Sequence, residues 1–111
     1  MAVLARYYQP GSALDYINNT VKTINAGTVI DLKTRIAIAA SDIAPGQRGV
    51  IEMEGVWIFP KTAGSGEIKL GAPVYFDGTG ITGTAGSSTP AGYATADASD
   101  EDTEITVKLL G

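Results

Sequence analysis

The acidic run at residues 97–104 is where the sequence concentrates side chains that could bind a cation. It holds five carboxylates in eight residues, and carboxylate oxygens are the ligands that Ca²⁺ prefers. An EF-hand loop needs Gly at its sixth position and Glu at its twelfth. The sixth position counted from Asp97 is Asp102, so the spacing departs from that loop. We interpret the run as a solvated turn.

The residue types on which most enzymes depend are missing. The chain has no His and no Cys, which removes the commonest general base, the commonest metal ligand and the thiolate nucleophile. Residues 64–69 resemble a phosphate loop only superficially, because the Gly-Lys-Ser/Thr ending is absent. Glu52 and Glu54 lie on one face of a predicted strand, where alternation on an exposed face explains them. We therefore expect no catalytic, cofactor-binding or metal-binding residue, and no enzymatic activity.

Size and charge narrow the classes of partner. A chain of 111 residues with 44% hydrophobic and 18% charged residues is typical of one globular domain. Residues 62–111 hold two basic and seven acidic side chains, which argues against a nucleic-acid partner. No apolar run approaches the roughly 20 residues of a membrane-spanning helix, and residues 1–10 lack the pattern of a secretory signal. We expect the protein to remain in the cell that makes it, or in a particle assembled there.

Turn residues punctuate the chain into short β-forming runs, so the predicted fold class is all-β. We expect a small single-domain β-barrel or sandwich with an extended N-terminal arm. Residues 36–40 are apolar throughout, which predicts a strand buried on both faces or in a tight barrel interior. Asp77-Gly78 between two β runs predicts a hairpin. The expected strands cover residues 14–17, 20–24, 28–32, 35–40, 50–54, 56–59, 74–76, 80–84, 92–96 and 104–110.

The N-terminal residues differ in character from the rest. We divide the chain into an arm at residues 1–13 and a β-domain at residues 14–111. The pair Tyr7 and Tyr8, close to Pro10, is unusual for a solvated tail. Two interpretations stay open: the tyrosines pack on the arm's own domain, or they dock on a partner.

Two segments of equal length suggest an internal repeat. Residues 36–55 and 92–111 each contain an Ala-rich strand, an Asp-bearing loop, a second strand and a Gly. The alignment places residues 37–42 against 93–98. A pseudo-duplicated fold is one hypothesis, and chance similarity in a Gly- and Ala-rich chain is the other.

The order of several short sequence motifs in this chain resembles that of a family of small phage proteins regarded as capsid cement, or head decoration, proteins. Some members carry a recombinase label, but a RecA-type ATPase needs a phosphate loop that this chain lacks. The resemblance covers roughly residues 20–111. The motifs that carry the resemblance are residues 25–29, residues 36–46, Gly55-Val56-Trp57-Ile58-Phe59-Pro60-Lys61, residues 70–77 and residues 105–109.

The resemblance implies a virion structural protein that binds the outer surface of a phage capsid and stabilises the expanded head. The implied partner is the major capsid protein, and a homo-oligomer is expected, a trimer by resemblance with a monomer as the alternative. Tyr7, Tyr8 and Pro10 are the expected contacts with the capsid or with a neighbouring subunit. A glycan-binding or host-surface module is the alternative function, and it would use Trp57 and Tyr75 as stacking platforms.

Overall fold

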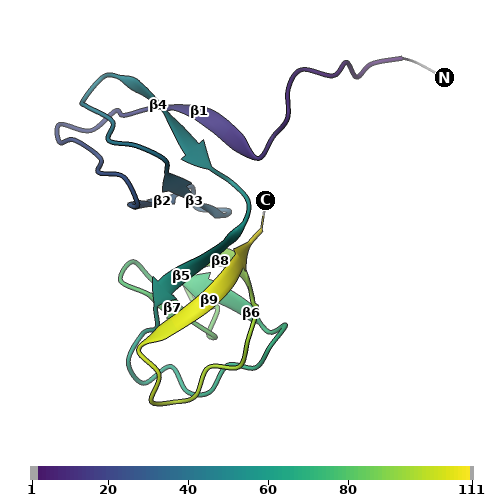
Figure 1. The fold of residues 1–111 in the computed structure, drawn as a ribbon, viewed down its shortest axis with the longest axis vertical. Helices are drawn as coiled ribbons and strands as arrows, with labels where there is room; N and C mark the ends of the chain where they lie inside the picture. Colours follow the sequence, from purple (N-terminus) through teal and green to yellow (C-terminus); the bar gives the residue numbers. More distant parts are fainter. Residues whose placement is uncertain (1–2, 111) are drawn as a thin grey trace.

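The computed structural model describes residues 3–110, which form two antiparallel sheets joined by turns (Figure 1). The first sheet has the order β1-β4-β3-β2 and the second β5-β9-β8-β6-β7. The first comprises β1 (Ala13–Ile17), β2 (Val29–Asp31), β3 (Ile36–Ala39) and β4 (Arg48–Glu52). The second comprises β5 (Val56–Pro60), β6 (Pro73–Phe76), β7 (Ile81–Thr82), β8 (Thr89–Ala94) and β9 (Glu104–Leu109). The all-β prediction is confirmed, and no helix that could span a membrane occurs among the described residues.

The sheets remain open, so a closed barrel is not formed. In the second sheet a single bridge joins Lys61 to Ile81, close to the two outer strands. That bridge is isolated, and it does not extend into a ladder that would close the sheet. Of the two architectures expected from the sequence, the barrel is therefore not the one observed.

Strand β3 lies between the two sheets' cores and is buried on both faces, as predicted. Ile36 and Ile38 pack into the core of the second sheet, whereas Ala37 and Ala39 lie in a separate cluster on the other face of the first sheet. The shared core also contains Phe59, Ile68, Val74, Ile81, Ala91, Ala94, Ala98, Ile105, Val107 and Leu109. The Thr89 hydroxyl adds a polar link, donating to Asp31 Oδ1 at 2.8 Å.

The expected strand at residues 20–24 is wrong. Only Ile24 pairs there, in an isolated bridge to Ile43. The segment wraps around the buried side chain of Asn18 instead: Asn18 Nδ2 donates to the Lys22 carbonyl at 2.8 Å, and the Thr20 hydroxyl donates to Asn18 Oδ1 at 2.6 Å. This local polar network replaces the ladder that the alternation of residue types had indicated.

The two sheets repeat one strand plan, as the internal-repeat hypothesis predicted. The order β1-β4-β3-β2 corresponds to β5-β9-β8-β6, and β7 is an addition to the second unit. Equivalent turns use the same hydrogen bonds. The N–H of Gly27 (φ 87°) donates to the Ala39 carbonyl at 2.9 Å, and the N–H of Gly71 (φ 86°) donates to the Ala94 carbonyl at 2.8 Å.

The hydrogen bonds correct the alignment of the repeat by one residue. Asp42 Oδ1 accepts the Ala26 N–H at 2.8 Å, and Asp97 Oδ1 accepts the Leu70 N–H at the same distance. Asp42 is therefore equivalent to Asp97, and not to Ala98 as the sequence comparison had placed it. The two loops perform the same task, since each carboxylate holds the turn that precedes the second strand of its sheet.

Candidate interaction surface

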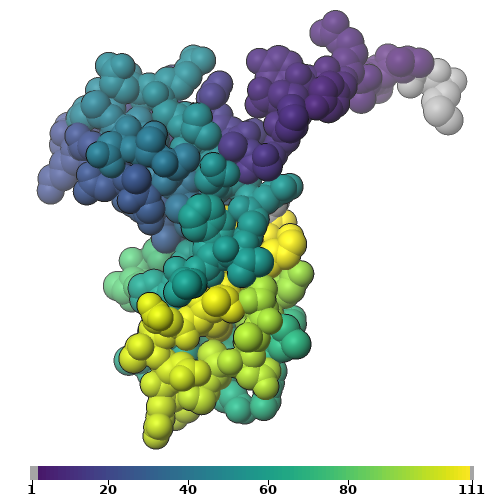
Figure 2. Space-filling view, in the orientation of Figure 1, coloured from purple at the N-terminus to yellow at the C-terminus, as the bar shows by residue number. Residues whose placement is uncertain are grey.

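The N-terminal arm lies away from the body of the protein. Residues 3–11 contain no strand, and Figure 2 shows the arm projecting from the first sheet. Its root is fixed where the Ser12 carbonyl accepts the Met53 N–H at 2.8 Å. Beyond that point the side chains are exposed, among them Tyr7 at 84% and Tyr8 at 89%. The structure therefore shows the two tyrosines in solvent rather than packed on the arm's own domain.

The arm carries several exposed apolar side chains close together. Its exposed large apolar side chains are Val3, Leu4, Tyr7 and Tyr8. Scattered exposed apolar residues are ordinary on a protein surface, but a contiguous exposed patch marks an interaction site. Arg6 is the only charged residue among residues 3–14. Pro10 is also exposed and lies just before the bend into β1.

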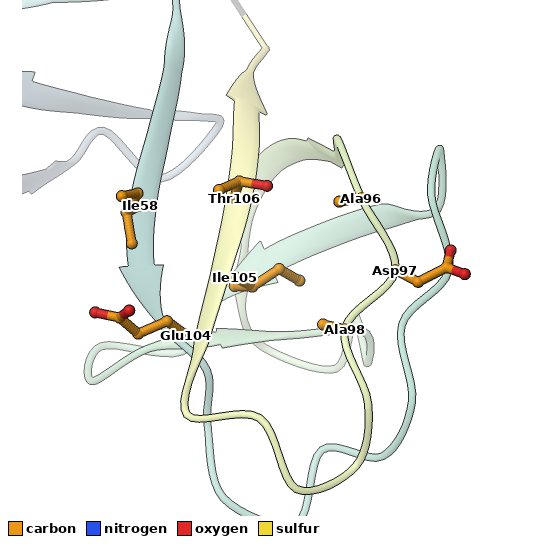
Figure 3. Close-up of a pocket in the computed structure, with 7 residues that line it drawn as sticks. All are labelled: Ile58, Ala96, Asp97, Ala98, Glu104, Ile105 and Thr106. Atoms are coloured by element: carbon orange, nitrogen blue, oxygen red, sulfur yellow. The ribbon is translucent and has the colours of Figure 1, made fainter.

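A second exposed apolar feature lies on the outer face of the second sheet. Val56 and Ile58 are 59% and 68% exposed on β5, which is an outer strand of its sheet. Ile58 borders a shallow groove of about 250 Å³, whose lining residues Figure 3 draws. We call this the outer groove; it is lined by Ile58, Ala96, Asp97, Ala98, Glu104, Ile105 and Thr106.

The acidic run has a structural task in this region. Asp97 holds the Leu70 turn, and Asp102 Oδ2 accepts the Ser99 N–H at 2.7 Å. Within residues 3–110, no three acidic side chains converge in a way that would hold a metal ion. The carboxylates support the loop that leads into β9. The Glu104 side chain has no hydrogen bond or ion pair in the described chain and stands at the edge of the outer groove.

A second carboxylate, Asp77, closes the predicted hairpin. Its Oδ2 accepts the Thr62 hydroxyl at 2.6 Å, and its Oδ1 accepts the N–H groups of Thr79 and Gly80, each at 2.9 Å. Partial desolvation raises the pKa of Asp77, but these hydrogen bonds stabilise the ionised form more strongly and lower the pKa to about 2. The geometry is that of a turn that holds β6 and β7 together.

The aromatic residues that a sugar-binding site would use are only partly accessible. Trp57 is half-buried against the shared core, and its Nε1 donates to the Glu54 carbonyl at 3.0 Å. Tyr75 is also half-buried. A stacking platform needs an open ring face, so the exposed aromatic surface of the described chain is concentrated on the arm.

Comparison with known proteins gives one decisive match. The sequence profile described as phage cement protein matches residues 8–109 of the 111 residues. The chain belongs to the phage cement protein family. The match extends to residue 8 and so covers more of the chain than the residues 20–111 expected from sequence. A search of curated proteins gives no significant match, and a search of solved structures gives none either.

Membership supports a structural role at the phage capsid and a location in the virion. The matched residues contain both sheets, whereas Tyr7 and the residues before it lie outside the match. The cement protein therefore has its scaffold in common with its family. The sequence did not indicate its outer groove, although the alternation of Val56, Ile58 and Pro60 on one strand face is a signal for an exposed apolar strand face.

Proposed function

We propose that this cement protein binds the outer surface of the capsid and stabilises the expanded head, and that Tyr7, Tyr8 and Pro10 of its arm contact the capsid or a neighbouring subunit. We divide the chain into an arm at residues 1–13 and a decoration domain at residues 14–111. The observation that carries the proposal is the exposure of Tyr7 and Tyr8 on a segment that makes no use of them in its own fold. Aromatic side chains are enriched among the few interface residues that dominate binding energy.

The mechanism is adhesive and needs no chemical step. Sites shared between capsid subunits form when the head expands, and a protein that bridges such a site adds buried area to a particle strained by packaged DNA. A standard interface buries about 1,600 Å² in total. A protein that contacts two capsid subunits at once gains avidity beyond either contact.

The partner we propose is the major capsid protein, with self-association of the cement protein as a second contact. The acidic second half of the chain disfavours a nucleic-acid partner, and we propose neither a membrane partner nor a cofactor. Assembly takes place in the host cytoplasm, and the mature location is the outer surface of the head. The role is structural, without enzymatic activity.

Truncation of the arm tests the proposal. A chain that starts at Leu14 retains both sheets, except for Ala13 at the start of β1, and it loses Tyr7, Tyr8 and Pro10. We expect it to bind heads lacking the cement protein at least 30-fold more weakly than the full chain, since truncating one central aromatic costs about 2 kcal/mol. Replacement of the exposed Val21, which lies in a loop of the first unit, by Ala is the matched control. Equal binding by the truncated and full chains would refute the role of the arm.

A further inference from the structure

The arm and the outer groove have complementary chemistry. The arm presents Arg6 directly beside Tyr7 and Tyr8. The groove presents the apolar side chain of Ile58 near the carboxylate of Glu104, with Asp97 on the opposite side (Figure 3). One feature is a cation next to two aromatic rings, and the other is an apolar surface bordered by acidic groups. Tyr7, Tyr8 and Ile58 are exposed, and of the two carboxylates Asp97 is the one that the fold already uses, since it accepts the Leu70 N–H.

The charges of both sides are available for a contact. The side chains of Arg6 and Glu104 have no hydrogen bond or ion pair within residues 3–110. Asp97 is already held by the Leu70 N–H at 2.8 Å and lies 4.0 Å from Lys69 Nζ. Glu104 is therefore the carboxylate better placed to receive a new cation. An Arg fork pairs with a carboxylate through two parallel hydrogen bonds, which fixes orientation as well as adding affinity.

The arm of one chain does not lie over its own groove. It leaves from Ser12, beside the end of β4, and projects away from the β5–β9 side of the protein (Figures 1 and 2). The groove lies toward the far end of β5 and the start of β9. We propose that the outer groove binds the N-terminal arm of a second copy of this protein, with Arg6 facing Glu104 and a tyrosine ring on Ile58.

Such a contact is heterologous, because the arm of one copy meets a different surface of the next. Contacts of this kind close into a ring or continue as an open chain of copies, whereas two copies that exchange arms reciprocally form an isologous dimer. The exchange requires no capsid, so it differs from the head-binding role and is testable on the isolated protein. It also assigns the exposed face of β5 to contacts between cement subunits.

Disulfide trapping tests the exchange directly, because the natural chain has no Cys. Two variants of the full chain are prepared separately, Tyr8→Cys in the arm and Ile58→Cys in the groove, then mixed and oxidised. We expect a covalent heterodimer on a non-reducing gel, at least tenfold more abundant than with the exposed control Val21→Cys in place of Ile58→Cys. Because successive side chains of an extended segment point to opposite sides, Tyr7→Cys and Tyr8→Cys should differ markedly in yield.

Charge reversal supplies a second test that leaves the fold intact. Glu104→Arg should lower the trapped yield severalfold, and adding Arg6→Glu to the partner should restore it. A double variant Tyr8→Cys, Ile58→Cys that gives only internally linked monomers would overturn the proposal in favour of closure within one chain. Yields no higher than the Val21→Cys control would also overturn it. If such a protein still decorates heads, the exchange fails while the proposed capsid role stands.

Discussion

Replacement of Asn18 by Ala should lower the free energy of unfolding more than replacement of any other polar residue in the first unit. The Asn18 side chain is fully buried. Its Nδ2 donates to the carbonyls of Lys22 and Ile43, both at 2.8 Å, and its Oδ1 accepts the N–H and hydroxyl of Thr20 at 2.9 and 2.6 Å. This one amide therefore ties three parts of the chain together.

The magnitude follows from these four hydrogen bonds. Each is worth about 1 kcal/mol net, which gives an upper bound of about 4 kcal/mol. The loss is smaller because the Ile43 carbonyl keeps its bond from the Ile24 N–H at 2.9 Å, and the exposed Thr20 turns to water. We expect Asn18→Ala to lower the free energy of unfolding by about 2–3 kcal/mol, which corresponds to a fall in Tm of roughly 10 °C for a domain of this size.

The assay is urea denaturation followed by far-UV circular dichroism and by the fluorescence of Trp57, the single Trp. The control is Asn19→Ala, since the neighbouring Asn19 is exposed and should change stability by less than about 0.5 kcal/mol. Because Trp57 belongs to the second sheet, coincident transitions by the two probes would also establish that both sheets unfold together. Equal stability of the two variants would refute the assignment of Asn18 as the anchor of its loop.

Three further predictions concern the second sheet and the shared core. Gly92→Ala should destabilise the protein by about 3 kcal/mol or more, the scale of a severe backbone clash, because φ at Gly92 is 149° and a Cβ there would overlap a carbonyl of β9. The control is Gly11→Ala, where an added Cβ meets no neighbouring atom. Chemical denaturation compares the stabilities of the two variants. Because folding lowers the pKa of Asp77 from 3.8 to about 2, its ionised carboxylate stabilises the fold fully above pH 3.8, and this stabilisation is lost as the pH falls through about 2. NMR titration of Asp77, and acid denaturation compared with Asp77→Asn, would detect this. An ordinary pKa for Asp77 would contradict it. Ile36→Ala should lower the free energy of unfolding by about 2–5 kcal/mol, because Ile36 is 1% exposed. The matched control Ile58→Ala, at an exposed position, should leave the stability nearly unchanged. Equal thermal stabilities of the two variants would contradict the place of β3 in the core that the two sheets share.

The sequence was most informative where local physics decides the structure. The apolar run at residues 36–40 has no polar alternation, which favours a strand buried on both faces or in a tight barrel interior, and β3 is the strand buried on both faces. The Asp77-Gly78 hairpin has its own turn chemistry, since the carboxylate caps the following N–H groups. In both cases the residues that specify the element lie within it.

Features that depend on distant partners were not predictable. The Asn18-Asn19 pair reads as a turn, and nothing local indicates that Asn18 is the buried residue of the two. The alignment of Asp42 with Ala98 was wrong by one residue because the repeated loops differ in length, and only the hydrogen bonds to Ala26 and Leu70 reveal the equivalence. The neighbour of β5 is β9, more than 40 residues later in the chain, so the outer groove exists only once the sheet has formed.

The measurement that tests the central claim most directly is the number of copies of this chain in purified phage particles. Quantitative mass spectrometry against the major capsid subunit gives the ratio. The account predicts a ratio near one, or a simple fraction set by capsid symmetry. Absence from particles, with the protein abundant in infected cells, would contradict a cement role.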